Sequence, residues 1–183
     1  MAYIGGIVTG FYLFASAPGI HKKTKWQHLT GWDYAHRGLY NNEHGIPENS
    51  MAAFRRAVDK GYGIELDVHL TADNQLVVFH DDTLTRMCGV NKKISSFLYS
   101  DLMQLRLLGT EEGIPLFKDV LELIDGKVPL IIELKVDGSN QNLLCPLVWQ
   151  LLSRYKGDYC IESFHPFVLQ WFKRHEPQVV RGQ

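Results

Sequence analysis

The sequence predicts an α/β protein whose strands form a parallel sheet. Short runs of β-type residues alternate with amphipathic helical segments, which is the order of repeated βαβ units. The strand predicted at 129–134 is almost entirely apolar, as is typical of parallel strands that helices cover on both faces. With 183 residues, 45% of them hydrophobic, the chain is long enough for one main domain.

The first predicted helix, at 50–60, has clear local signals. From Met51 its apolar residues recur at i, i+3, i+6 and i+7, the spacing of one helical face. Asn49 or Ser50 can cap its start, and Gly61 can end it. Strands are predicted before it at 34–36 and after it at 64–68 and 76–80.

The second half repeats this alternation after an irregular stretch at 81–114. A helix from Phe117 has Val120, Leu121 and Ile124 on one face, and Gly126 ends it. The remaining predicted elements are a strand at 129–134, a helix at 144–152, a strand at 159–163, a helix at 168–172 and a strand at 178–181.

About six β units are therefore visible, whereas a (β/α)₈ barrel needs eight, usually in about 250 residues. Three interpretations stay open: a fragment, a truncated gene, or a sheet that remains open. An open sheet would leave the first and sixth strands with unpaired edges, which folded proteins normally cover.

Composition narrows the class of partner. The chain has 19 Lys+Arg and 20 Asp+Glu, so no broad basic surface for nucleic acid is indicated, and a small-molecule or lipid-derived partner fits better. Cys88, Cys145 and Cys160 are widely spaced without a CxxC pair, which argues against a zinc site or a disulfide framework. We interpret all three as small buried hydrophobic residues.

Acidic residues occupy alternate positions on the strand at 64–68. Glu65 and Asp67 point to one face, and like charges in a buried place are unfavourable unless a cation balances them. Glu133 follows the apolar run of the strand at 129–134. We therefore expect these carboxylates to bind a divalent cation, either Mg²⁺ or Ca²⁺. The alternative, a solvent-facing polar side of the strand, is less consistent with a strand between helices.

Lys135 lies two positions after Glu133 and so shares its face. It forms either a structural salt bridge or a phosphate-binding group beside the metal ligands.

Two histidines stand at the ends of predicted strands, where the active sites of parallel α/β barrels gather. His36 ends the first strand and His80 the third. Arg37 is placed to bind a phosphate oxygen, and Asp81 is placed to orient the imidazole of His80. His69 continues the face of Glu65 and Asp67, and we predict a rim position without a role for it. We interpret His36 and His80 as catalytic.

Several short motifs occur in a fixed order: His36-Arg37-Gly38, Pro47-Glu48-Asn49-Ser50 followed by Ala53-Phe54, Glu65-Leu66-Asp67-Val68 and His80-Asp81. In these motifs the chain resembles the glycerophosphodiester phosphodiesterase family. The resemblance continues through Ile114-Pro115-Leu116, Ile132-Glu133-Leu134-Lys135 and Ser163-Phe164, and covers about 35–183.

This resemblance implies a TIM barrel, a divalent metal on Glu65, Asp67 and Glu133, and catalytic histidines at His36 and His80. Glu48 would add a metal ligand or hold its loop. The stretch at about 82–114 corresponds to a small insertion beside the mouth of the family's barrel, where it would shape substrate choice. The family's last strands and helices have no counterpart in the sequence.

The implied activity is metal-dependent hydrolysis of glycerophosphodiesters to glycerol 3-phosphate and an alcohol, with the two histidines as acid and base. One alternative is a related phosphodiesterase acting on lysophospholipids or sphingomyelin-type lipids. Another is an inactive, membrane-tethered fragment that needs a partner chain to complete its sheet. Separately, the sequence is compatible with a homo-oligomer.

The N-terminus predicts membrane attachment. From Ala2 to Ile20 no residue is charged, and a helix of that length reaches about 28 Å, close to the thickness of the bilayer core. Lysines at 22, 23 and 25 follow, so the positive-inside rule predicts a cytoplasmic catalytic part. A cleaved signal peptide, which would make the protein secreted, and a buried helix are the alternatives.

The expected organisation is an anchor at 1–21, a linker at 22–32 and a phosphodiesterase domain at 33–183, with an insertion at about 82–114.

Overall fold

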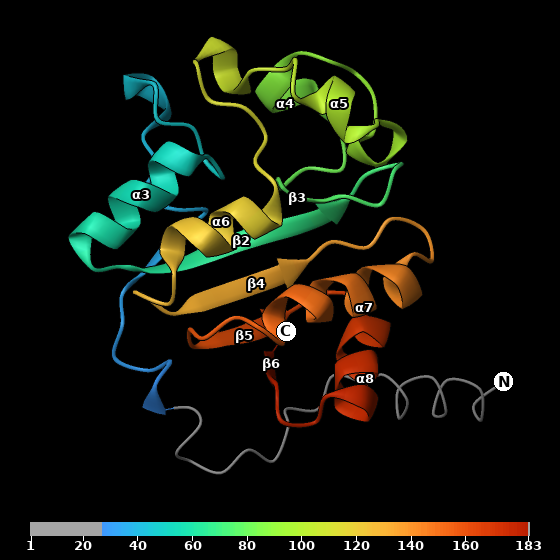
Figure 1. Cartoon of the computed structure of the whole chain (residues 1–183). Helices are drawn as coiled ribbons and strands as arrows, with labels where there is room; N and C mark the ends of the chain where they lie inside the picture. The colour runs from blue at the N-terminus through green and yellow to red at the C-terminus, as the bar shows by residue number, and fades with distance from the viewer. Residues whose placement is uncertain (1–26, 183) are drawn as a thin grey trace, which may run out of the picture.

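The computed structural model describes residues 27–182, which form a twisted sheet with helices packed on one face (Figure 1). The strands are β1 (Tyr34–His36), β2 (Gly63–Leu70), β3 (Leu76–Val78), β4 (Leu130–Leu134), β5 (Tyr159–Glu162) and β6 (Val180–Gly182). Five of them pair in parallel in the order β1-β2-β4-β5-β6, which confirms the predicted parallel sheet.

The predicted number of barrel units is wrong, because β3 is not a parallel strand. It pairs antiparallel with β2, with Val68 opposite Val78. Only residues 71–75 join the two strands, and Thr71 closes this turn by donating its backbone N–H to the carbonyl of Gln75. Because a parallel connection needs a crossover of a dozen or more residues, so short a loop can only reverse the chain. The described sheet therefore has five parallel strands plus one antiparallel strand, rather than about six β/α units.

The main helices are α3 (Met51–Lys60), α6 (Phe117–Ile124), α7 (Gln141–Leu152) and α8 (Pro166–His175). Of the two candidate caps for α3, Ser50 is the one used: its hydroxyl accepts from the backbone N–H of Ala53. Gly61 ends α3 in the left-handed conformation, as predicted. At the end of α6 that conformation begins at Asp125, one residue before the predicted Gly126.

The two faces of the sheet have different chemistry because side chains alternate along each strand. On β2, Ile64, Leu66 and Val68 are fully buried in the core against the helices. Residues of the opposite parity, Glu65 and Asp67, point to the other face, where the polar site is built.

The segment predicted as an insertion contains short helices and a core of its own. It carries α4 (Thr85–Cys88), α5 (Tyr99–Leu102) and two 3₁₀ turns, η2 (Ile94–Ser96) and η3 (Leu107–Gly109). A further 3₁₀ turn, η1 (Asn42–His44), lies in the loop after β1. The separate core includes Phe79, Leu84, Met87, Ile94, Leu102, Leu107 and Ile114. In Figure 1, α4 and α5 lie together beyond β3, away from the main helices.

The ends of this insertion meet at the sheet. The backbone N–H of Val78 donates to the carbonyl of Pro115 at 2.9 Å, and Val77 forms a bridge with Leu116. The chain thus leaves the sheet and returns to it at nearly the same place.

The predicted anchor at 1–21 and part of the linker lie outside the described residues. Between residues 27 and 182, no helix is both long and apolar enough to cross a membrane.

Candidate metal and catalytic site

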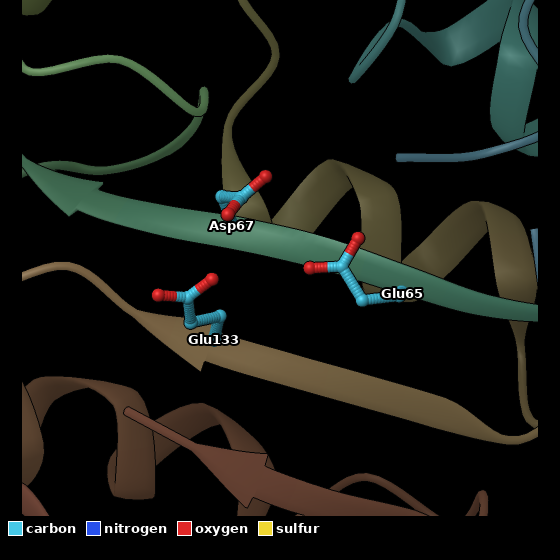
Figure 2. Close-up of side chains that lie close together, drawn as sticks. All are labelled: Glu65, Asp67 and Glu133. Carbon is cyan, nitrogen blue, oxygen red and sulfur yellow. The ribbon is translucent and has the colours of Figure 1, made fainter. Parts of the chain in front are cut away.

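Three carboxylates converge where β2 and β4 run side by side. The strand register places Asp67 opposite Glu133, and Glu65 precedes Asp67 by two positions on the same face. Figure 2 shows the three side chains pointing into the same space. One oxygen from each of Glu65, Asp67 and Glu133 lies within 4.8 Å of the others, so the predicted ligands do come together.

The electrostatics of this cluster favour a bound cation. Asp67 is fully buried. Burial, followed by the charge of Asp67, raises the pKa of Glu65 to about 7, even though the backbone N–H of Arg37 donates to Glu65 Oε2 at 2.9 Å. A cation among the carboxylates would relieve this repulsion.

Lys135 is the one side-chain ammonium that the described residues bring to the cluster. Its Nζ lies 2.8 Å from Glu133 Oε2 and 3.0 Å from Asp67 Oδ1. The contact with Asp67 is an ion pair that does not have the geometry of a hydrogen bond. Burial alone would lower the pKa of Lys135, but its carboxylate partners raise it above the ordinary value. The salt bridge weighed from the sequence is therefore present, and the lysine is also within the site.

The donor set fits a hard divalent metal ion. Three carboxylates supply the oxygen ligands that Mg²⁺ and Ca²⁺ take. Asn49 Oδ1 beside them is a buried oxygen without a hydrogen-bond partner, and Asp67 Oδ1 has only its ion pair with Lys135. Because buried polar atoms are normally paired, these two oxygens indicate a position for a cation.

Asn49 has a role that its sequence context left open. Its Nδ2 donates to Asp67 Oδ2 at 2.9 Å, and its backbone is left-handed at φ 54. Since Ser50 caps α3, Asn49 serves the site instead of the helix.

His36 and His80 both border the cluster, but their surroundings differ. The side chain of His36 is 65% exposed, with Nε2 3.9 Å from Glu65 Oε2. Burial and the nearby Arg37 lower its pKa. His80 lies two residues beyond β3, not within it as predicted, and its Nδ1 is 2.6 Å from Asp81 Oδ1. The predicted pairing of Asp81 with His80 is confirmed.

The predicted rim position of His69 is wrong, because this residue is only 2% exposed. Its Nε2 lies 3.2 Å from the backbone carbonyl of His80, so it must donate there. The register of β2 and β3 places His69 opposite Val77, and the chain that continues beyond β3 brings the carbonyl of His80 to its ring.

Glu48 holds its loop and is not one of the three clustered carboxylates. It is 4% exposed and accepts from Arg37 Nη1 at 2.9 Å and from both terminal nitrogens of Arg86, at 2.8 and 2.7 Å. Burial would raise its pKa, but the two guanidinium groups lower it.

Two residues at the site were not predicted. Arg86, on α4, contacts both Glu48 and Asp81, and nothing in its local sequence pattern marked it. Glu162, on β5, is in register with Glu133, and burial and the charge of Glu133 raise its pKa. Glu133 was marked as an acidic residue that follows an apolar run on a strand, and Glu162 likewise follows Cys160 and Ile161, so that signal was available.

The profile of the glycerophosphoryl diester phosphodiesterase family matches residues 36–180, a span that contains every residue of the site. The chain belongs to this family. Among curated relatives of this phosphodiesterase family, lysophospholipase D GDPD1 of Rattus norvegicus is 33% identical over 172 residues, which are 87% of this chain and 52% of that protein. A glycerophosphodiester phosphodiesterase of Caldanaerobacter subterraneus is 34% identical over 164 residues, covering 81% of this chain and 64% of the relative.

Solved structures give the same result. An Oleispira antarctica phosphodiesterase in complex with the product sn-glycerol-3-phosphate matches with a TM-score of 0.77 and 26% identity, over 86% of this chain and 66% of the other. A glycerophosphodiester phosphodiesterase from Parabacteroides distasonis matches with a TM-score of 0.71 and 32% identity, over 82% and 63%. The sheet thus corresponds to part of the family's barrel, and the chain spans about half the length of the rat relative.

Proposed function

We propose that this protein hydrolyses glycerophosphodiesters to glycerol 3-phosphate and an alcohol, using Mg²⁺ or Ca²⁺ bound by Glu65, Asp67 and Glu133. The observation that carries the proposal is the convergence of these three carboxylates within 4.8 Å in a chain that matches the phosphodiesterase family. The product named for the Oleispira antarctica structure supports the same substrate class.

The phosphate would be bound by the cationic groups that border the carboxylates. A divalent ion at this site would supply Lewis-acid stabilisation of charge on the non-bridging oxygens. Arg37 has Nη1 on Glu48 and its buried Nε 3.8 Å from Asp67 Oδ2, so Nη2 is the part of its guanidinium that would contact the phosphate. Lys135, one residue beyond the end of β4, adds a second positive charge.

The two histidines would move the protons. One takes the proton of the glycerol 2-hydroxyl as its oxygen attacks phosphorus, and the other gives a proton to the departing alcohol oxygen as its bond to phosphorus breaks. Water then opens the resulting cyclic phosphate, with the histidines in reversed roles, and glycerol 3-phosphate is released. Either assignment of acid and base to His36 and His80 satisfies this scheme.

The direct test is release of glycerol 3-phosphate from glycerophosphocholine by this chain, with Mg²⁺ or Ca²⁺ and with EDTA. Metal-dependent release is the expected result. A folded sample that releases no product under any metal condition would reject the proposal.

Replacing either histidine should lower turnover without loss of the metal. His36→Ala and His80→Ala should each reduce kcat by roughly 10²-fold or more, the usual contribution of a general acid or base. Metal binding, followed by calorimetry, should persist because neither residue is a ligand. His175→Ala is the matched control, because this histidine lies on α8 with its ring stacked on Trp171 and is not one of the site residues. Unchanged turnover in a site variant would remove that histidine from the mechanism.

A second substrate class is lysophospholipids, favoured by the similarity to a protein named lysophospholipase D. Comparing glycerophosphocholine with lysophosphatidylcholine as substrates separates the two. If neither is cleaved, the remaining alternative is an inactive fragment that needs a partner chain. A monomer with a cooperative thermal transition would count against that alternative.

Membrane attachment through residues 1–21, with the catalytic part in the cytoplasm, completes the proposal. Protease treatment of intact cells tests it: degradation of the catalytic part would reverse the orientation.

A further inference from the structure

A chain of charged groups connects His80 with the loop that carries Arg37. Asp81 contacts His80, Arg86 contacts Asp81 and Glu48, and Glu48 contacts Arg37. The linked residues come from three separate segments: the loop after β1, the end of the β2–β3 hairpin and helix α4 of the insertion. Arg86 is the residue that joins the first of these segments to the second.

Both carboxylates meet Arg86 in a two-point contact. Nε and Nη2 of Arg86 donate to Oδ2 and Oδ1 of Asp81 at 2.8 and 2.9 Å. Nη1 and Nη2 donate to the two oxygens of Glu48, at 2.8 and 2.7 Å. Such paired contacts fix direction as well as distance, because the planar guanidinium matches the plane of a carboxylate.

The contact with Asp81 determines which ring nitrogen of His80 holds a proton. The Arg86 and His80 contacts lower the pKa of Asp81 to about 2, so this carboxylate can only accept hydrogen bonds. The Nδ1 of His80, 2.6 Å away, must then carry hydrogen. In the neutral ring Nε2 is consequently the bare nitrogen, free to exchange a proton with a substrate.

We propose that Arg86 is a positioning residue: it fixes the Asp81 carboxylate, and through it the tautomer and orientation of the His80 imidazole. Without Arg86, Asp81 keeps only its contact with His80 and is free to turn toward solvent, since its side chain is 23% exposed. Of its side-chain partners, Glu48 keeps only Arg37. The insertion therefore contributes an essential part of the site instead of acting only as a rim.

The tautomer can be measured without any substrate. Nitrogen NMR of the ring of His80, assigned by its loss in His80→Gln, should show that the neutral form of the ring is protonated at Nδ1 in the wild-type chain. In Arg86→Gln the signal should shift toward the form protonated at Nε2. Arg86→Lys, which keeps the charge but not the two-point contact, should lie between them. An Arg86→Gln ring identical to wild type would overturn the proposal.

Enzyme kinetics provide a second test of the role of Arg86, and this test rests on the proposed function. Arg86→Gln should lower kcat for glycerophosphocholine about 10–100-fold, as loss of an outer orienting partner does in metal sites, with a much smaller change in KM. Arg106→Gln is the matched control: it removes the same charge from the insertion, but Arg106 donates only to the carbonyls of Met103 and Leu105. Equal kcat in Arg86→Gln and Arg106→Gln would contradict the positioning role.

The NMR and kinetic measurements distinguish a failure of the proposed function from a failure of the proposed role of Arg86. If the wild-type chain cleaves no glycerophosphodiester, the proposed function fails while the tautomer comparison still tests Arg86. If Arg86→Gln does not fold because Glu48 keeps too few partners, Arg86→Lys carries both measurements. Wild-type tautomer and wild-type kcat in Arg86→Lys would then overturn the proposal.

Discussion

Asp67 illustrates how individual side chains prepare the site. It is fully buried, and its two oxygens meet Asn49 on one side and Lys135 on the other. A carboxylate held in this way presents a fixed direction to a cation, which is how outer partners improve metal affinity.

Replacing Asn49 should weaken metal binding through Asp67. Asn49→Gly removes the hydrogen bond but keeps the left-handed backbone at φ 54 unstrained. We expect a loss of metal affinity of about tenfold or more, as for other outer partners of metal ligands. Asn49→Ala should lose the same affinity and also some stability. Unchanged affinity in the glycine variant, measured by calorimetry, would show that Asp67 needs no such support.

The cysteines should be poor nucleophiles in the folded protein. Burial raises the pKa of Cys145 to about 12, and burial with the charge of Glu162 raises that of Cys160 to about 12. The thiolate is the reactive form, so a thiol reagent at neutral pH should modify neither residue until the chain unfolds. Half-buried Cys88, whose pKa burial raises to about 11, should react first but slowly. Rapid native labelling of Cys145 or Cys160, located by mass spectrometry, would contradict this.

Residues on regular strands could be predicted, whereas residues that act across the fold could not. Alternation alone placed Glu65 and Asp67 on one face, and the structure brings Glu133 to them. Arg86 reaches the site only because the insertion folds back over the loop after β1, a contact that no local pattern encodes. The same limit applies to Asn49: the sequence correctly predicted a helix cap at 49–50, but Ser50 is the residue that caps the helix.

At the scale of elements, the loop between β1 and α3 is packed tightly onto the helix. Gly38 has φ +80, and a Cβ there would lie 2.9 Å from Ala53 Cβ and 3.0 Å from the Ala53 backbone. The glycine is thus needed both for its backbone conformation and for the close approach that keeps His36 and Arg37 beside the carboxylates.

Gly38→Ala should destabilise the protein more than Gly45→Ala. At Gly45, φ is +71 but no atom lies within 4 Å of an added Cβ, so only left-handed strain of about 1–2 kcal/mol is expected. At Gly38 an overpacking cost of about 1–3 kcal/mol adds to that strain. Urea unfolding of the two variants measures the difference. Equal free energies of unfolding would mean that α3 shifts freely to make room.

The β2–β3 hairpin shows why strand direction was misjudged. Its apolar run at 76–80 has the composition of a parallel strand, but the length of the preceding loop decides direction. The same hairpin ends β3 at Val78 and leaves His80 in a loop, where Asp81 can reach its ring.

At the scale of the whole molecule, metal binding should stabilise the fold, because the carboxylates belong to β2 and β4 at the centre of the sheet. A ligand at about one hundred times its Kd adds roughly 2.7 kcal/mol to the free energy of unfolding. The melting temperature should therefore rise with Mg²⁺ or Ca²⁺ and return with EDTA. Asp67→Asn should abolish the rise, while Asp125→Asn, on an exposed turn, should keep it. A metal-independent melt of the wild-type chain would argue against binding at these carboxylates.

The meeting of Val78 and Pro115 at the sheet has a consequence for how such proteins diversify. The insertion leaves and rejoins the sheet at one point and has its own core, but it also contacts the rest of the domain, because Ala72 donates to the carbonyl of Phe97 and Lys93 pairs with Asp137. A segment that replaced it would have to restore these contacts and also bring an arginine to the position of Arg86, so the proposed activity would depend on a residue outside the sheet.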